Sequence, residues 1–312
     1  MGAQYDNVFR TLVNDCPKLL IPFINEVFQE HYSEETPIRF HPNEHFANQK
    51  DGRMKKRITD TCFEILDTVP KKYHLECQST SDSSMLIRMF EYGAQIALDD
   101  GEVRENVLTV NFPHSAILYL RCGKDTPDKI RVEIRSPAGE LDYEIAVVKL
   151  NSYSLEEIFS KKLLFLIPFY IFTHESRFKV YDEDKEQRKV LLEEYQYIRD
   201  QLEKLALAGE IDEYIKRTLM EMTGKILEYL ARNHKKVRKG VKSVMVGKVL
   251  DYEAKRILNR GINQGFSEGV SQGLSQGKID AYRELLRDGL ITPEEAAKRL
   301  RISRQEAEKL MK

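Results

Sequence analysis

Cysteine is scarce in this sequence, and its four cysteines form no CxxC pair. Cys16, Cys62, Cys77 and Cys122 lie far apart along the chain. This spacing argues against a zinc ribbon and against the disulfide framework of a secreted protein. The first ten residues, MGAQYDNVFR, also lack the basic segment and the apolar stretch of a secretory signal. We therefore expect a cytoplasmic protein with reduced thiols.

Long hydrophobic runs are missing as well. The longest is LLFLIPFYIF at residues 163–172, and Pro168 interrupts it. A helix that spans a membrane needs about 20 consecutive apolar residues. We therefore expect residues 163–172 to form a buried segment of the core and not to contact a membrane.

Neither sign of charge is in excess, because 49 basic residues face 50 acidic ones and the formal net charge is −1. The molecule as a whole therefore has no net field that would attract nucleic acid or an anionic membrane. If the protein binds a polyanion, a local basic patch has to provide the attraction.

What the chain does contain is enough apolar material for a packed core, since 41% of its 312 residues are hydrophobic and 32% are charged. These proportions exclude a chain that is disordered throughout. The length allows about two domains, or one core with appendages.

The spacing of apolar residues predicts two short helices within residues 5–30, with Pro17 between them at a first-turn position. Short segments rich in β-branched and aromatic residues then predict strands, interrupted by one helix at about residues 84–98. The predicted strands are residues 57–66, 72–80, 115–121, 129–136 and 143–150. Strands mixed with flanking helices indicate an α/β fold.

The second half of the chain has a different pattern. Residues 155–260 are Leu-rich, charged and poor in glycine, which predicts several helices around the run at 163–172. Five glycines then recur at a spacing of four: Gly261, Gly265, Gly269, Gly273 and Gly277. Each would cost a helix about 1 kcal/mol, so the repeat is either a flexible tether or a helix held by a partner chain. The tether is the default interpretation, and a homo-oligomer joined through the repeat is the alternative.

Two capping-box sequences follow the repeat, TPEE at residues 292–295 and SRQE at residues 303–306. Each predicts the start of a short helix, with Pro293 at the first position of one of them, and another predicted helix precedes residue 292. This arrangement is compatible with a helix-turn-helix. Because most helical hairpins only pack against each other, DNA reading by this unit is the minority hypothesis.

Acidic residues on two predicted strands are candidate metal ligands, although their spacing alone favours side chains that face solvent or pair with lysine. The period of two along residues 72–80 turns the apolar side chains to one face and His74, Glu76 and Gln78 to the other, towards a cleft or solvent. If the strand carrying Asp60 is the neighbour, Asp60 and Glu76 converge, and two carboxylates suit Mg²⁺ shared with a phosphate. Such an ion activates water and neutralises charge on a scissile phosphate. The alternative is that these acids face solvent or pair with Lys55, Lys56, Lys71 and Lys72.

The order of these features resembles a known family. An acid on one strand, E-x-Q on the next and the helix MLIRMFEYGAQIAL at residues 85–98 are similar to the recombination-promoting nuclease/putative transposase family of the PD-(D/E)XK nuclease superfamily. The similarity continues in YDNVF at residues 5–9 and in the segment at residues 143–169. It covers residues 5–172, more than half of the chain.

The resemblance implies a restriction-endonuclease-like core, a mixed sheet flanked by helices, and Mg²⁺-dependent cleavage of DNA. It makes Asp60 and Glu76 the metal ligands, and it puts Gln78 where the superfamily has a lysine. Gln78 would orient the attacking water as a neutral donor and acceptor, without the lysine charge. Thr59 stands in place of the proline of the superfamily motif.

Together, pattern and resemblance divide the chain into four parts. We predict a nuclease-like domain at residues 1–172, a helical region at 173–260, a glycine-repeat tether at 261–277 and a C-terminal helical unit at 278–312.

Basic side chains would supply the local patch that DNA requires. Arg88 and Tyr92 lie one turn apart on the helix at residues 84–98 and could reach a phosphate, unless Arg88 pairs with Glu91. A second cluster, residues 232–242, contains six basic residues and no acid. Its predicted phosphate contacts are Lys235, Lys236, Arg238 and Lys239. The alternative for this cluster, and for the basic residues at 53–57, is a solvated surface.

We therefore predict a Mg²⁺-dependent DNA endonuclease associated with recombination or transposition. Two alternatives stay open. The first is a DNA-binding or regulatory module that keeps the core with weak catalysis or none. The second is an interaction protein that assembles through its C-terminal tail.

Overall fold

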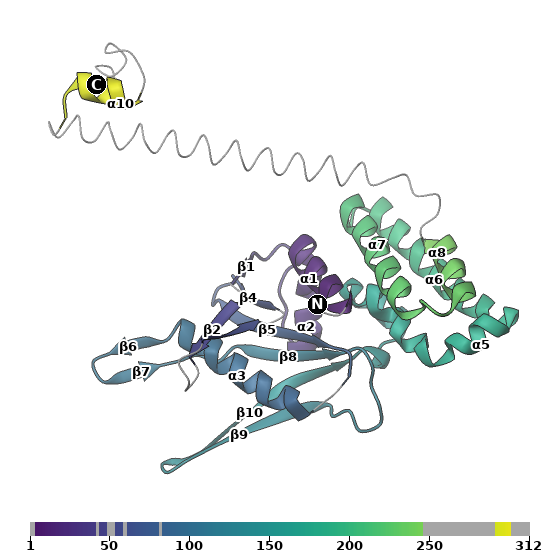
Figure 1. Cartoon of the computed structure of the whole chain (residues 1–312), viewed down its shortest axis with the longest axis horizontal. Coiled ribbons are helices and arrows are strands. Elements are labelled where there is room, and N and C mark those ends of the chain that lie inside the picture. The colour runs from purple at the N-terminus through teal and green to yellow at the C-terminus, as the bar shows by residue number, and fades with distance from the viewer. Residues whose placement is uncertain are drawn as a thin grey trace. The chain divides into compact units, whose positions relative to one another are not determined.

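The computed structural model describes residues 4–41, 44–48, 54–58, 61–80, 83–245 and 291–300, with the backbone alone at 44–48, 54–58, 83 and 298–300. The chain divides into two compact units, residues 1–247 and residues 248–312, which are described separately. In the first unit, helices lie on both faces of a central sheet and a further group of helices lies at one end (Figure 1).

Two N-terminal helices form against the sheet. In α1 (Gln4–Asp15), Leu12 and other apolar residues at helical spacing are buried. A 3-10 turn, η1 (Pro17–Leu19), follows with Pro17 at its first position, and α2 (Leu20–Phe28) completes the pair. Both helices predicted for this segment are confirmed.

A six-stranded mixed sheet is the centre of the first unit. In spatial order its strands are β1 (Ile38–Phe40), β4 (Thr61–Ile65), β5 (Lys71–Gln78), β8 (His114–Tyr119), β10 (Gly139–Lys149) and β9 (Lys129–Ser136). The β5–β8 and β8–β10 pairs are parallel, and the other pairs are antiparallel. Segments predicted as strands provide β4, β5, β8, β9 and β10, so the α/β class is confirmed.

Helix α3 (Ser83–Asp99) connects β5 to β8, as predicted for residues 84–98. Parallel neighbours need such a crossover, because a tight hairpin can join only antiparallel strands. The helix lies on the face of the sheet opposite to α1 and α2 (Figure 1). There Met85 and Met89 pack with Ile117 and Tyr119 of β8 in a small second core.

Two short hairpins lie outside the main sheet. One pairs β2 (Glu44–Asn48) with β3 (Met54–Ile58), and the other pairs β6 (Glu102–Arg104) with β7 (Val107–Thr109). The prediction of one strand over residues 57–66 is wrong, because β3 ends at Ile58 in one sheet and β4 begins at Thr61 in another. Local β-propensity does not reveal which partner a strand will pair with.

After β10 the described chain is helical, as predicted. The elements are η2 (Leu150–Ser152), α4 (Leu155–Ser160), η3 (Leu164–Arg177), α5 (Phe178–Glu183), α6 (Lys185–Leu207), α7 (Glu213–Leu230) and α8 (Lys235–Met245). The apolar run at residues 163–172 lies largely in the 3-10 helix η3 and is buried apart from Tyr170. Among the described residues, no helix has the length and hydropathy to cross a membrane.

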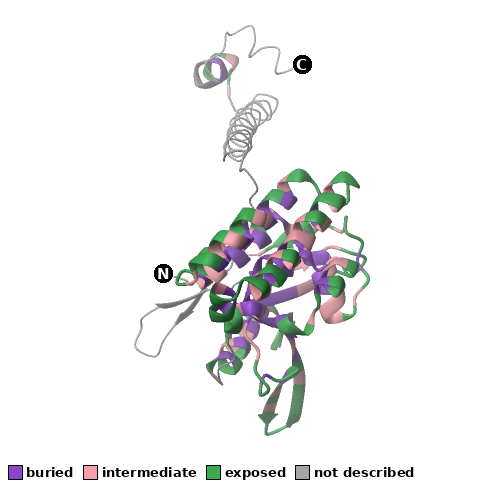
Figure 2. Ribbon diagram, turned by 90° about the vertical axis from the view of Figure 1, so that its right-hand side faces the viewer, coloured by how far each residue is buried: buried purple, intermediate pink, exposed green. Residues whose placement is uncertain are grey.

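One large core joins the sheet to the helical region. It runs from α1 and α2 through the strands to η3, α6, α7 and α8. Figure 2 shows the buried residues gathered where these helices meet each other and the sheet. The boundary predicted after residue 172 therefore falls inside η3, and the segments on both sides of it share one core.

The second unit contributes one described helix, α10 (Pro293–Leu300). The Thr292 N–H donates to Glu295 Oε2 at 3.0 Å, and the Glu295 N–H donates to Thr292 Oγ1 at 3.3 Å. The first predicted capping box is thus confirmed, with Pro293 at the first helical position. The glycine repeat at 261–277 and the second box at 303–306 lie outside the described residues, so the helix-turn-helix stays a prediction.

Candidate functional site

Strand β5 carries the predicted site, and its side chains alternate as expected. Tyr73, Leu75 and Cys77 belong to the large core, while His74 and Glu76 face α3. The ring of Tyr92 on α3 lies edge-on to the ring of His74, with centroids 5.8 Å apart and planes at 85°. Helix α3 therefore covers this face of the strand.

Glu76 is a buried carboxyl group. Only 3% of the residue is exposed, whereas the sequence predicted that it faces a cleft or solvent. The difference arises because α3 covers this face, and Ile117 lies opposite Glu76 on β8. A buried carboxylate needs polar partners to offset its loss of hydration. One partner is His74, whose Nε2 lies 3.0 Å from Glu76 Oε1.

His74 is fully buried beside Glu76. The register of the parallel strands places it opposite Ser115 on β8, and Ser115 Oγ lies 3.5 Å from His74 Nδ1. Together with Tyr92, these contacts hold the imidazole on three sides. The site thus contains a row of side chains that runs from β8 through His74 to Glu76.

Cys62 is the residue opposite His74 on the neighbouring strand β4. Burial raises the pKa of its thiol to about 12. Since the thiolate is the form that binds metals and attacks electrophiles, Cys62 is a neutral packing residue at ordinary pH. The site therefore offers oxygen rather than sulfur ligands.

The predicted metal partner of Glu76, Asp60, lies outside the described residues, directly before Thr61. Of the lysines that were the alternative partners, Lys71 lies 2.7 Å from Glu30, and Lys72 pairs with Asp100. The side chains of Lys55 and Lys56 are outside the described part of the chain. The two described lysines are thus engaged with acids other than Glu76.

Gln78 is the last residue of β5 and is half-buried. Its backbone oxygen accepts a hydrogen bond of 2.9 Å from the Leu120 N–H, which fixes the end of the strand beside β8. On α3, Arg88 is half-buried, but Tyr92 is only 7% exposed. The predicted phosphate contact by Tyr92 does not fit this burial, because the ring packs on His74 inside the protein.

The donor set of the site suits a hard cation such as Mg²⁺. Glu76 offers carboxylate oxygen, and the thiol of Cys62 on the neighbouring strand stays protonated. In the described part of the chain, no three His, Cys, Asp or Glu side chains come together as a complete metal site. Any Mg²⁺ site here therefore needs ligands in addition to Glu76, and Asp60 is the residue that the sequence predicts for this role.

The predicted DNA contacts lie on α8. Lys235, Lys236 and Lys239 are exposed at its N-terminal end, while Arg238 is half-buried. The apolar residues of the helix, among them Val237, are turned to the core. The exposed lysines are thus available to a phosphate backbone.

The fold adds acids to a cluster that has none in the sequence. Glu228 of α7 lies 3.1 Å from Lys242 Nζ and 3.5 Å from Arg238 Nε. Asp182 of α5 accepts the Lys236 N–H at 2.8 Å and so caps the helix. The cluster is therefore partly neutralised, and Arg238 is a weaker candidate for a phosphate contact than the three exposed lysines.

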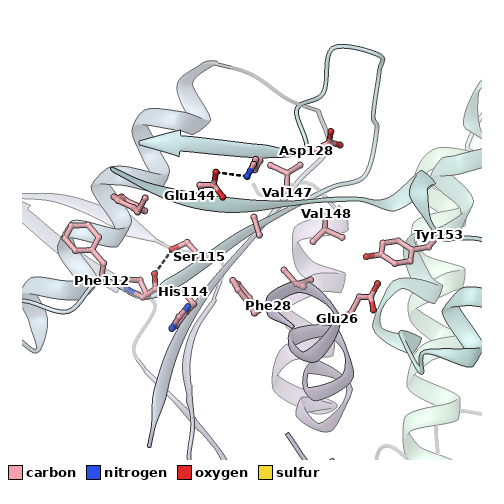
Figure 3. A pocket seen from close by; sticks show the side chains of 15 residues that line it. Glu26, Phe28, Phe112, His114, Ser115, Asp128, Glu144, Val147, Val148 and Tyr153 are labelled. Atoms are coloured by element: carbon pink, nitrogen blue, oxygen red, sulfur yellow. Dashed lines mark hydrogen bonds and ion pairs between the residues drawn. The ribbon is translucent and has the colours of Figure 1, made fainter. Parts of the chain in front are cut away.

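A cavity of about 500 Å³ lies between α2 and strands β8 and β10, and Ser115 is one of the residues that line it (Figure 3). Each of its carboxylates faces a lysine. The pairs are Glu26–Lys161 at 2.7 Å, Asp128–Lys149 at 2.6 Å and Glu144–Lys129 at 2.7 Å. Neither Glu76 nor Gln78 lines this cavity, so it is not the predicted site.

Sequence reasoning placed His74 on the correct face but assigned it no role. The sequence did indicate this contact, because the period of two in a strand puts His74 and Glu76 side by side on one face. Ser115 carried no such signal, since it comes from β8, 41 residues beyond His74. Only the parallel β5–β8 register brings it to the site.

Comparisons with protein-family models, with curated proteins and with solved structures found no match to this chain.

Proposed function

We propose that this chain is a Mg²⁺-dependent DNA endonuclease with a restriction-endonuclease-like core, which hydrolyses phosphodiester bonds in recombination or transposition. The sequence resemblance over residues 5–172 suggests this activity, and the geometry of β4 and β5 supports it.

The observation that carries the proposal is the register of these two strands. Thr61 pairs with Leu75 in the antiparallel β4–β5 ladder. Asp60 directly precedes Thr61, and Glu76 directly follows Leu75. Consecutive Cα atoms are about 3.8 Å apart, so the two acids are one residue away from a pair of directly facing strand positions. A metal shared by two carboxylates requires such proximity, so this register supports Asp60 and Glu76 as the proposed pair of ligands.

The topology is a second support. Glu76 lies on β5, Asp60 directly precedes the antiparallel neighbour β4 in the sequence, and α3 then crosses to a parallel strand on the far side of β5. The acid and the amide of the E-x-Q sequence thus lie in the interior of a mixed α/β sheet. The finer assignment to the restriction-endonuclease-like fold is part of the proposal.

In the proposed mechanism, Asp60 and Glu76 hold the metal, which would lower the pKa of a bound water and stabilise charge on the scissile phosphate. Gln78 orients the attacking water through its amide, accepting one hydrogen bond and donating another. The exposed lysines of α8 bind the DNA backbone and add no sequence preference.

The test is a plasmid-nicking assay in Mg²⁺ with wild type, Asp60→Ala and Glu76→Gln. Glutamine keeps the volume of Glu76 and an acceptor for His74 while removing the anionic ligand. We expect each variant to lose at least about 100-fold in cleavage rate, because even outer-shell partners of a metal are worth 10–100-fold.

The matched control is Glu64→Gln, which removes a carboxylate from β4 that pairs with Arg39 at 3.3 Å. It should cleave like wild type. Folded Asp60→Ala and Glu76→Gln proteins that nick DNA at the wild-type rate would show that the site is misassigned. A wild type that binds DNA without cleaving it would favour the non-catalytic DNA-binding module.

A further inference from the structure

The imidazole of His74 has no role in the mechanism above, yet it touches the proposed metal ligand directly. It is fully buried, and its Nε2 lies 3.0 Å from Glu76 Oε1. Ionised carboxylates only accept hydrogen bonds. An ionised Glu76 therefore accepts its hydrogen bond from a protonated Nε2, and this arrangement defines one tautomer of the ring.

With Nε2 protonated, Nδ1 is the acceptor of a neutral imidazole. Ser115 Oγ lies 3.5 Å from Nδ1 and 3.4 Å from the backbone oxygen of Pro113, so its one hydrogen is shared between two long contacts. The edge-on ring of Tyr92 limits rotation of the imidazole from the α3 side. Serine and tyrosine thus hold a ring whose other nitrogen binds the carboxylate.

We propose that His74 is a positioning residue of the metal site, which orients the carboxylate of Glu76 by hydrogen-bonding its Oε1. This inference rests on the proposed function. Groups that hydrogen-bond metal ligands typically contribute 10–100-fold to metal affinity, because they fix the orientation and the basicity of the ligand. The competing explanation is a buried pair that serves packing alone.

Two substitutions separate the hydrogen bond from the packing. His74→Gln keeps an amide N–H group within reach of Glu76, and His74→Phe keeps the volume of the ring without a donor. The readout is Mn²⁺ binding to the protein without DNA, measured by the loss of the free-ion electron paramagnetic resonance signal. Folding of every variant is checked by circular dichroism and by thermal melting.

We expect His74→Phe to weaken Mn²⁺ binding by about 10–100-fold and His74→Gln to stay within about threefold of wild type. The control is His174→Phe, because His174 in η3 is also buried and its Nε2 lies 2.9 Å from Glu194. That variant loses a His–Glu pair whose histidine is buried and whose glutamate is half-buried, so it should melt earlier and bind Mn²⁺ as wild type does.

A folded His74→Phe protein with wild-type Mn²⁺ affinity overturns the inference, and so does His74→Gln if it binds as weakly as His74→Phe. If His74→Phe does not fold, Ser115→Ala provides the test, because it keeps His74 but removes the hydroxyl group beside Nδ1. We then expect Mn²⁺ binding to weaken several-fold. Unchanged Mn²⁺ binding contradicts the inference. A wild type that neither binds Mn²⁺ nor cleaves DNA removes the proposed function as well. The two failures are therefore distinguishable.

Discussion

At the scale of single residues, the pairing of Glu76 with His74 is unusual for a core position. Removing both groups from water costs free energy, and the contact of 3.0 Å between His74 Nε2 and Glu76 Oε1 offsets part of that cost. Apolar residues of similar volume would be at least as stable under α3. A buried histidine–carboxylate pair is therefore weak evidence for a stabilising role, and the positioning role proposed for His74 gives the pair another purpose.

Gln78 gives the first prediction. Gln78→Lys should cleave DNA at least as fast as wild type, because the lysine stem can extend from the half-buried end of β5 and bring a charge to the phosphate. Gln78→Ala should be slower, since it removes both hydrogen-bonding groups. The measurement is the single-turnover cleavage rate in saturating Mg²⁺.

The control for added charge is Gln95→Lys on α3, where Gln95 donates to Asp99 at 2.9 Å. That variant should leave the cleavage rate unchanged. Loss of activity in Gln78→Lys combined with full activity in Gln78→Ala would remove Gln78 from the mechanism.

A second prediction at this scale concerns Glu194, which lies 2.9 Å from His174 Nε2 and accepts the Tyr170 hydroxyl at 3.0 Å. Burial alone would raise the pKa of Glu194, but the hydrogen bonds and charges of His174, Tyr170 and Arg177 outweigh burial and lower it. A carboxyl group with a lowered pKa stabilises the fold above its unfolded pKa, about 4.3, and loses that contribution as the pH falls further.

We therefore expect the difference in unfolding free energy between wild type and Glu194→Gln to shrink as the pH falls below about 5. Chemical denaturation at a series of pH values measures this difference. Glu193→Gln, which removes an exposed charge from the same helix, controls for the change in net charge. A Glu194→Gln difference that stays constant down to pH 3 would contradict the assignment.

At the scale of elements, the periodicity of the sequence predicted most helices and strand faces, but it did not predict which strands pair with each other. The period of two placed His74 and Glu76 on the correct face of β5, and the period of 3.6 located α1, α2 and α3. What the sequence could not supply was tertiary: that α3 buries Glu76, that Ser115 meets His74, and that β3 and β4 belong to different sheets. These features depend on contacts between segments that are distant along the chain, and no local pattern records them.

The charge around helix α8 was likewise not predictable from the local sequence, because Glu228 of α7 pairs with Arg238 and Lys242 only in the fold. The exposed lysines of this helix give the third prediction. Replacing Lys235, Lys236 and Lys239 with glutamine should weaken DNA binding on all sequences alike. Each lost phosphate contact should reduce the slope of log K against log salt by about 0.9, so the triple variant should lose about 2.7. Binding titrations at several salt concentrations in the Asp60→Ala background, where the DNA stays intact, measure the slope.

A matched triple variant on α6, with Lys185, Lys189 and Lys204 replaced by glutamine, removes the same charge from another helix and should leave the slope nearly unchanged. In addition, Glu228→Gln should strengthen binding, because it releases Arg238 and Lys242 from their ion pairs. Equal slopes for the α8 variant and wild type would assign these lysines to a solvated surface and direct attention to the basic residues at 53–57.

At the scale of the whole molecule, the described residues of the large core all lie in the first unit. The large cluster begins in α1 and ends with Met245 at the end of α8, and it includes the buried faces of α6, α7 and α8, whereas α3 packs in the smaller second core. None of the described residues of the second unit belongs to this cluster. Residues 1–172 and the helical region after them are therefore expected to unfold together, while the tail is expected to be separable.

The last prediction follows from this division. A chain that ends at Gly247 should keep the wild-type melting temperature and the wild-type rate of plasmid nicking, because it retains the first unit with its core and the proposed site. If the glycine repeat joins partner chains, the full-length protein should be an oligomer and the shortened protein a monomer in light scattering after size-exclusion chromatography. A shortened protein that is still oligomeric would place the contact within residues 1–247. A shortened protein that melts earlier would mean that the tail contributes to the stability of the first unit, and would contradict the independence of the two units.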